Sequence, residues 1–262
     1  PLGLFGIAFS LAAFPSFKLS IAEKREKDFF VILSQTARRI LFFVLPISIL
    51  MIIFRAQFVR VILGAGYFDW EDTIMTFEVL KFLSVSLFAQ SLIPLFSRAF
   101  FALQNTKTPL YISLVSEAVY IALIFILLPR YAILGIAMAF SASNVLNLVL
   151  LYVFLRKKIS FWNDQQFLSP AMNIFFVAIL AGIVAQISKS IFALTTNELD
   201  TFVEVFLQLV IGLGIGGASF VLLCHWFGIE ELKMVKRFVL YKVLRQPEIV
   251  AAVEDHPEKG DW

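Results

Sequence analysis

Four polar side chains stand inside long apolar stretches of this sequence and are its best candidates for chemistry. They are Arg98, Glu117, Asn144 and Asn147. A guanidinium can bind two phosphate oxygens at once, and a carboxylate in a water-filled cavity can contact a substrate or an ion. Because polar groups inside a membrane are costly, the four residues are candidates for lining a substrate path.

Arg98 and Glu117 each have a structural interpretation as well. Arg98 lies about one turn from the end of its apolar segment, so its long side chain could reach lipid headgroups instead of a substrate. Glu117 could be a protonated carboxyl near the membrane surface, or one that bonds to Ser113, Ser116 or Tyr120. For Glu117 the two interpretations are equally open.

Asn144 and Asn147 are three residues apart and share a helix face. With Ser141 and Ser143 they form a polar stripe, which favours hydrogen bonding between neighbouring helices. The glycine-rich run at residues 212–217 likewise has the spacing of a close helix contact. It follows no strand and does not predict a nucleotide-binding loop.

The sequence has none of the usual catalytic or metal-binding patterns. The single Cys224 excludes a multi-cysteine metal site, and His225 and His256 have no partner at metal-ligand spacing. There is no Ser–His–Asp set, no His-Glu-x-x-His motif and no phosphate loop. The sequence therefore predicts neither an enzyme nor a cofactor or metal site, and a transporter fits better.

Composition places these residues in a membrane. Hydrophobic residues make up 60% of the 262 and charged residues 16%, and the mean hydropathy is +0.88. Soluble domains average about 45–50% apolar and about 25% charged residues. The isoelectric point near 9.0 does not indicate nucleic-acid binding, because the basic residues separate apolar runs and form no continuous patch.

About 20 apolar residues are needed to cross a bilayer as a helix, and seven segments qualify. The predicted fold is all-α, a polytopic bundle with these spans: 1–17, 39–63, 77–103, 109–129, 131–155, 169–188 and 201–227. The first lacks a basic leader and a cleavage site, so it is expected to be the second half of a helix and not a signal peptide. Pro94 is expected to kink the third span, and the fourth and fifth to form a tight hairpin.

The remaining segments are assigned to membrane surfaces. Residues 19–38 are expected to form a helix lying along the cytoplasmic surface. Residues 1–160 then make up one lobe and residues 161–228 an additional helix pair. Residues 229–262 are expected to be a cytoplasmic basic helix, ending near residue 244, followed by a disordered tail.

Charges alternate between successive connections and orient the bundle. Clusters of Lys and Arg lie at residues 18–39, at Lys107, at residues 156–158 and at residues 233–245, whereas the intervening connections carry acids or isolated bases. Basic loops stay in the cytoplasm. The sequence thus predicts a multi-pass membrane protein with its C-terminus in the cytoplasm.

One polar turn lies between the third and fourth spans on the predicted cytoplasmic side. Its residues are Gln104, Asn105, Lys107, Thr108 and Pro109. Helix capping and contact with lipid headgroups are favoured over substrate binding for this turn.

Four segments together resemble the MurJ/MviN family, the lipid II flippases of the MOP exporter superfamily. They are residues 1–8 with Pro15, residues 61–68 with Asp72 and Thr73, residues 100–109, and residues 135–141 with Asn147. They appear in the family's order and on the matching sides of the membrane. Phe101 and Asn105 depart mildly from the Tyr and Asp that the family carries.

The resemblance implies the C-terminal lobe of an alternating-access transporter and the extra helix pair. The implied substrate is undecaprenyl-pyrophosphate-linked peptidoglycan precursor, moved across the bacterial inner membrane by a monomer. The helix that holds sodium in some members offers Glu117 and Tyr120 here, which do not match cleanly, so coupling to sodium or to the membrane potential stays open. The family's extra pair forms a groove for a polyprenyl tail, and the rings of Phe175, Phe176, Phe202 and Phe206 fit that role or plain lipid contact equally.

Two alternatives remain at this point. One is another MOP-type exporter, for lipid-linked O-antigen sugars or for drugs. The other is a membrane-bound glycosyltransferase, which would need acidic metal-binding motifs in a loop.

Overall fold

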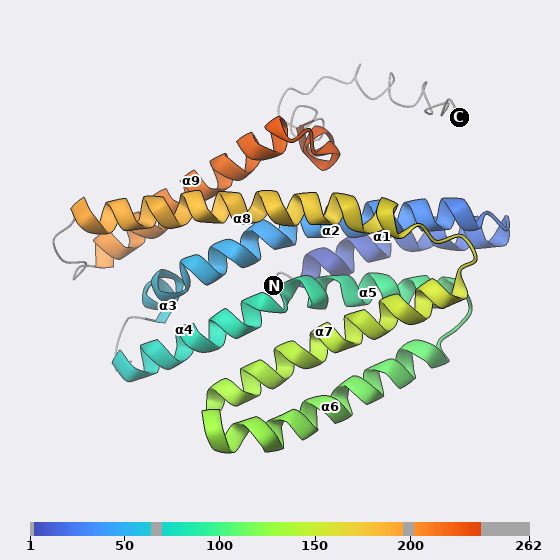
Figure 1. Ribbon diagram of the computed structural model, residues 1–262, viewed down its shortest axis with the longest axis horizontal. Helices are drawn as coiled ribbons and strands as arrows, with labels where there is room; N and C mark the ends of the chain where they lie inside the picture. Colours follow the sequence, from blue (N-terminus) through green and yellow to red (C-terminus); the bar gives the residue numbers. More distant parts are fainter. Residues whose placement is uncertain (1–2, 64–69, 196–201, 237–262) are drawn as a thin grey trace.

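The computed structural model describes residues 3–63, 70–195 and 202–236, and within these ranges it contains helices and no strand. The all-α prediction is confirmed. The helices lie roughly side by side, with α1 behind α2 and α5 (Figure 1). Their bounds are α1 Gly3–Ala22, α2 Glu26–Ile53, α3 Arg55–Leu63, α4 Trp70–Val85, α5 Leu87–Ala102, α6 Lys107–Tyr131, α7 Ile133–Lys158, α8 Asp164–Thr195 and α9 Phe202–Trp226.

Seven helical segments in the described ranges are long and apolar enough to span a membrane. They correspond one to one with the seven predicted spans, and α4 and α5 together make the third. The α1–α2, α5–α6 and α7–α8 connections lie at one end of the bundle, which we name the basic end (Figure 1). The α6–α7 connection lies at the opposite end, as do the end of α3 and the beginning of α4.

The predicted surface helix at residues 19–38 is wrong. The structure instead has a helical hairpin in which α1 continues to Ala22 and α2 begins at Glu26. Phe29, Phe30 and Leu33 are fully buried, and the rings of Phe17 and Phe29 lie 5.1 Å apart across the hairpin. These apolar contacts hold the segment inside the bundle, and its exposed charged residues 23–28 lie at the turn.

The second predicted span, 39–63, also has different bounds. α2 ends at Ile53, and the chain resumes as the short helix α3 after Phe54. Phe54 is fully buried because Gly212 of α9 leaves room for its ring. A Cβ atom at Gly212 would lie 2.2 Å from the Phe54 Cζ. The break between α2 and α3 is thus fixed by a ring that fits against a glycine.

The third span is interrupted at Ser86, and Pro94 lies inside α5 without ending it. Ser86 N bonds to Leu83 O in a tight turn, which leaves the carbonyl of Phe82 without its helical partner. Ser141 of α7 donates to that carbonyl at 2.6 Å. The interruption is stabilised by a neighbouring helix, as is typical inside membranes.

Two close helix contacts complete the bundle. α6 and α7 form the predicted tight hairpin around Ala132, whose φ is 48°. α8 and α9 pack against α2, where Gly182 and Gly216 accept the side chains of Ile49 and Leu50. Buried residues of α8 and α9 belong to the same apolar core as those of α1, α2, α5 and α7. The predicted additional pair is therefore continuous with the lobe.

The region after α9 docks back onto α2. Residues 230–236 are helical, and Ile229 and Leu232 are buried in the main core. The predicted tail beyond residue 236 and the loop motif at residues 64–69 lie outside the described residues.

Candidate functional site

Arg98 bridges two helices. Its guanidinium, on α5, donates to the hydroxyl of Ser10 on α1, and that hydroxyl donates to Ile7 O at 2.9 Å. The two helices touch backbone to backbone one turn away, because a Cβ atom at Gly6 would lie only 2.0 Å from Ser91 O. Arg98 is half-buried, and its guanidinium lies at the contact between α1 and α5.

Asn144 and Asn147, both partly buried on α7, differ in their hydrogen bonding. Asn144 Nδ2 donates to Phe140 O, one turn back in its own helix, at 2.8 Å. The Oδ1 of Asn147 is buried and has no hydrogen-bond partner. The helix-to-helix bonds predicted for this stripe are made by the serines instead: Ser143 donates to Ser116 O at 2.7 Å.

Glu117 is exposed on α6. Within the described residues its carboxylate forms no hydrogen bond or ion pair, so the predicted bonds to neighbouring hydroxyls are not formed. The hydroxyl of Ser116 has no partner either, and the ring of Tyr120 packs edge-on against Phe140 at 5.9 Å. Arg98, Glu117, Asn144 and Asn147 form no hydrogen bonds with one another.

The polar turn between α5 and α6 is a pair of helix caps. Gln104 adopts a left-handed backbone with φ 55°, which lets Asn105 N bond to Phe100 O at 3.0 Å. The side chain of Asn105 accepts from Thr108 N at 3.2 Å and donates to the Thr108 hydroxyl at 2.8 Å. These bonds satisfy backbone groups that helix ends leave free.

Four charged residues at the opposite end of the bundle were not predicted as site residues. Arg55 of α3 pairs with Glu78 of α4, Glu78 also pairs with Lys81 of its own helix, and Lys189 of α8 donates to Ile53 O at 2.9 Å. The signal was present in the sequence, since Glu78 and Lys81 stand three residues apart inside a predicted span.

A buried amide pair lies beside these charges. Gln57 Nε2 donates to Gln208 Oε1 at 2.8 Å, and Gln208 Nε2 donates to Lys189 O at 3.1 Å. Both side chains are almost fully buried. These two hydrogen bonds connect α9 to α3 and to α8.

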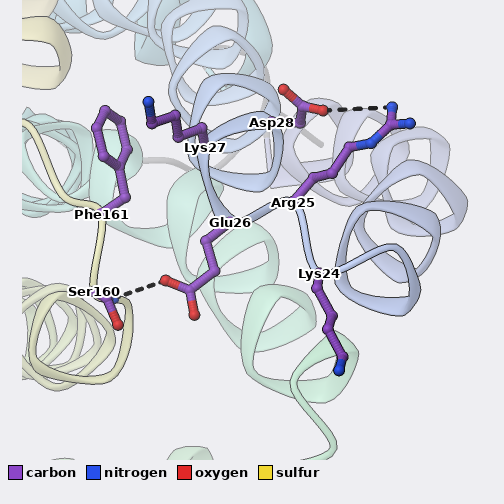
Figure 2. Close-up of a pocket in the computed structure, with 7 residues that line it drawn as sticks. All are labelled: Lys24, Arg25, Glu26, Lys27, Asp28, Ser160 and Phe161. Atoms are coloured by element: carbon purple, nitrogen blue, oxygen red, sulfur yellow. Dashed lines mark hydrogen bonds and ion pairs between the residues drawn. The ribbon is translucent and has the colours of Figure 1, made fainter.

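A cleft of about 660 Å³ lies at the basic end, where the α1–α2 turn meets the α7–α8 connection (Figure 2). The carboxylate of Glu26 accepts from Ser160 N at 3.1 Å. Lys27 Nζ lies 5.3 Å from the ring centre of Phe161, and Arg25 pairs with Asp28 at 3.8 Å. The cleft is an exposed, charged junction that links the hairpin to the helix pair.

Among the described residues, no group of three or more His, Cys, Asp or Glu side chains is placed to hold a metal ion. The features that stand out are polar contacts between transmembrane helices: Arg98 with Ser10, the amide pair, and the charges around the end of α2. Polar groups placed in this way can stabilise the helix bundle, or they can contact a polar solute within a bilayer.

Comparison with known proteins gives the same family that the sequence motifs indicate. A family model described as "Lipid II flippase MurJ" matches residues 1–222. A probable lipid II flippase MurJ of Thermotoga maritima is 31% identical over 237 residues, covering 90% of this chain and 45% of the relative. A probable lipid II flippase MurJ of Rhizobium tropici is 28% identical over 189 residues, covering 72% of this chain and 36% of the relative. The chain thus spans less than half the length of these relatives.

The fold is similar to a solved structure. The solved chain is titled "Lipid II flippase MurJ, inward closed conformation", with a TM-score of 0.69 and 20% sequence identity. The match covers 94% of this chain and 45% of that one.

Proposed function

Because this chain belongs to the MurJ family of lipid II flippases, we propose that it forms the C-terminal half of a transporter that moves lipid-linked peptidoglycan precursor across the bacterial inner membrane. The observation that carries the proposal is the family match over residues 1–222, in a chain with seven candidate membrane spans. The relatives named above are about twice as long as this chain, which supports assigning it to one half of such a transporter.

We propose that the basic end faces the cytoplasm. The turns of residues 22–26 and 102–107 and the connection at residues 158–164 lie together there, and they carry most of the Lys and Arg residues of the connections. Basic loops are retained in the cytoplasm. Residues 229–236 then also lie on the cytoplasmic side, because Glu231 pairs with Arg38 on the half of α2 nearer the basic end, at 3.4 Å.

The proposed mechanism is alternating access between two halves of the transporter. Polar residues would line the route of the substrate's polar head, and the lipid tail would stay in contact with the hydrocarbon. Arg98 and Glu117 are the charged path candidates of this half, and Asn144 and Asn147 are the neutral ones. The mechanism requires no covalent step, no cofactor and no second copy of the protein. Sodium or the membrane potential are the two candidate sources of coupling.

The exposed rings of α8 and α9 fit contact with lipid tails. Phe175, Phe176, Phe202 and Phe206 are between 43% and 59% exposed, which suits either bilayer lipid or the polyprenyl chain of the substrate. Another MOP-type exporter is not favoured, because the relatives found carry the lipid II flippase name.

The test is a flipping assay in cells depleted of their own lipid II flippase. The full-length protein containing this chain is expressed, and outer-leaflet lipid II is measured with an external enzyme that cleaves it. We expect expression to restore cleavage, and Arg98→Ala to reduce it more than Lys158→Ala, an exposed substitution at the basic end. The proposal fails if lipid II stays inaccessible while the protein is present in the membrane.

A further inference from the structure

Three cations and one carboxylate gather around the end of α2 that points away from the basic end. Arg55, Lys81 and Lys189 supply the positive charges and Glu78 the negative one. We name these four residues the α2-end cluster. They come from α3, α4 and α8, so the cluster exists only because these helices meet there.

Part of the charge is compensated by α2 itself. Arg55 Nη1 donates to Ile52 O at 3.1 Å, and Lys189 Nζ donates to Ile53 O at 2.9 Å. These are the last carbonyls of the helix, where the helix dipole is equivalent to about −0.5 charge. Arg55 and Lys81 also share the carboxylate of Glu78.

The four residues are not balanced among themselves. Three cations share the single carboxylate of Glu78 and the carbonyls at the end of α2. Lys189 is also within electrostatic reach of Arg55, so the two cations repel each other. Because cations outnumber the carboxylate among these four residues, the cluster is suited to an additional anion.

The cluster is open to such a ligand. The side chains of Arg55, Glu78 and Lys81 are 31%, 24% and 33% exposed, and Lys189 is also half-buried. Rings lie beside all three cations: Phe77 is 5.4 Å from Arg55, Phe82 is 5.0 Å from Lys81 and Phe54 is 5.9 Å from Lys189. An anion that arrives with an apolar chain fits these surroundings.

The position of the cluster along α2 indicates the outer leaflet. Arg38, which pairs with Glu231 toward the basic end, is 17 residues before Arg55. At about 1.5 Å per helical residue this separation is about 25 Å, close to the hydrocarbon thickness of about 30 Å. If Arg38 lies at the inner headgroups, the cluster lies at the outer ones.

We propose that the α2-end cluster binds the phosphate of a lipid in the outer leaflet. A guanidinium and two ammonium groups match phosphate oxygens, and exposed apolar residues of α8 continue from Lys189 toward the hydrocarbon: Ile183, Val184 and Ile187. The phosphate belongs to a bilayer phospholipid or to a polyprenyl diphosphate. Both present the same group at the same depth.

The test measures lipid binding to the purified, delipidated full-length protein by native mass spectrometry. The probes are short-chain phosphatidylglycerol against its diacylglycerol, farnesyl diphosphate against farnesol, and inorganic phosphate. We expect each phosphorylated lipid to bind more tightly than its alcohol counterpart and than inorganic phosphate. Whichever phosphorylated lipid binds more tightly identifies the source of the phosphate.

Two substitutions shift the cluster charge in opposite directions. Lys81→Gln removes a cation, and we expect it to weaken phosphate-lipid binding about tenfold. Glu78→Gln removes the carboxylate, and we expect binding to tighten. Lys158→Gln, an exposed control at the basic end, is expected to leave the affinity for phosphorylated lipids unchanged. If Lys81→Gln does not fold, the comparison of Glu78→Gln with Lys158→Gln tests the proposal.

Three results would overturn the proposal: phosphorylated lipids bind no better than their alcohols, inorganic phosphate binds as tightly as the lipids, or the Glu78 and Lys158 variants are indistinguishable. The measurement requires no transport. It therefore tests the cluster independently of lipid II flipping.

Discussion

The contact between α1 and α5 can be tested by adding a single methyl group. In Gly6→Ala the new Cβ atom would lie 2.0 Å from Ser91 O and 2.7 Å from Ser91 C. Both atoms belong to backbone, so no side-chain rotation relieves the clash. A carbon–oxygen contact needs roughly 3.3 Å, so the helices must separate by more than 1 Å.

The separation removes more than one contact. Ser10 lies one turn along the same face of α1, so its hydrogen bond from Arg98 is stretched as well. Overpacking of this kind costs about 1–3 kcal/mol, and the lost bond to a charged donor adds about 1.5 kcal/mol. For a protein about twice as long as this chain, the total of roughly 3 kcal/mol corresponds to a thermal midpoint lower by roughly 3–6 °C.

The assay is thermal unfolding of the full-length protein in detergent. Gly214→Ala is the matched control, because a Cβ atom there meets nothing within 4 Å and alanine favours a helix over glycine by roughly 0.8 kcal/mol. We expect the control midpoint to stay equal or rise. Equal midpoints for Gly6→Ala and the unsubstituted protein would refute the close contact of α1 and α5.

Three further predictions use the same unfolding assay or local protection. Gln57→Leu leaves the side-chain oxygen of Gln208 buried without its donor and should cost about 1–3 kcal/mol; replacing both by Leu should recover part of the loss, and additive losses would argue against the bond. Asn105→Ala removes a helix cap and should lower stability by about 1 kcal/mol, whereas no change would mean that the cap is not formed in the membrane. Glu231→Gln removes the buried carboxylate that pairs with Arg38 of α2, so backbone hydrogen exchange at residues 229–236 should become faster. Glu230→Gln, at the exposed carboxylate, should have a smaller effect. Equal exchange in both variants would contradict the docking of residues 229–236 onto α2.

The positions of the helices follow largely from the sequence. The length of each apolar run is a local property, so the seven predicted spans all correspond to helical segments. Caps are local as well: the bonds of Asn105 to Thr108 use residues three positions apart. The surface helix predicted at residues 19–38 was wrong, because the charged residues of this segment suggested a membrane surface whereas its buried rings contact residues distant along the chain.

The contacts of the candidate site follow much less from the sequence. Arg98 was visible as a charge in an apolar run, but its partner Ser10 is 88 residues away. Glu78 and Lys81 were overlooked because their significance comes from Arg55 on another helix. A sequence pattern shows that a polar group is costly in a membrane, and it does not show which helix supplies the compensation.

The sequence by itself determined that this chain crosses a membrane, where its spans lie, which end is basic and which family it belongs to. These depend on hydropathy, charge and short motifs, which act over a few residues. Only the tertiary structure decided that residues 22–26 turn a hairpin, that the third span breaks at Ser86, and that three cations meet at the end of α2. These depend on which helices lie side by side, because close packing and hydrogen bonding join atoms that are distant along the chain.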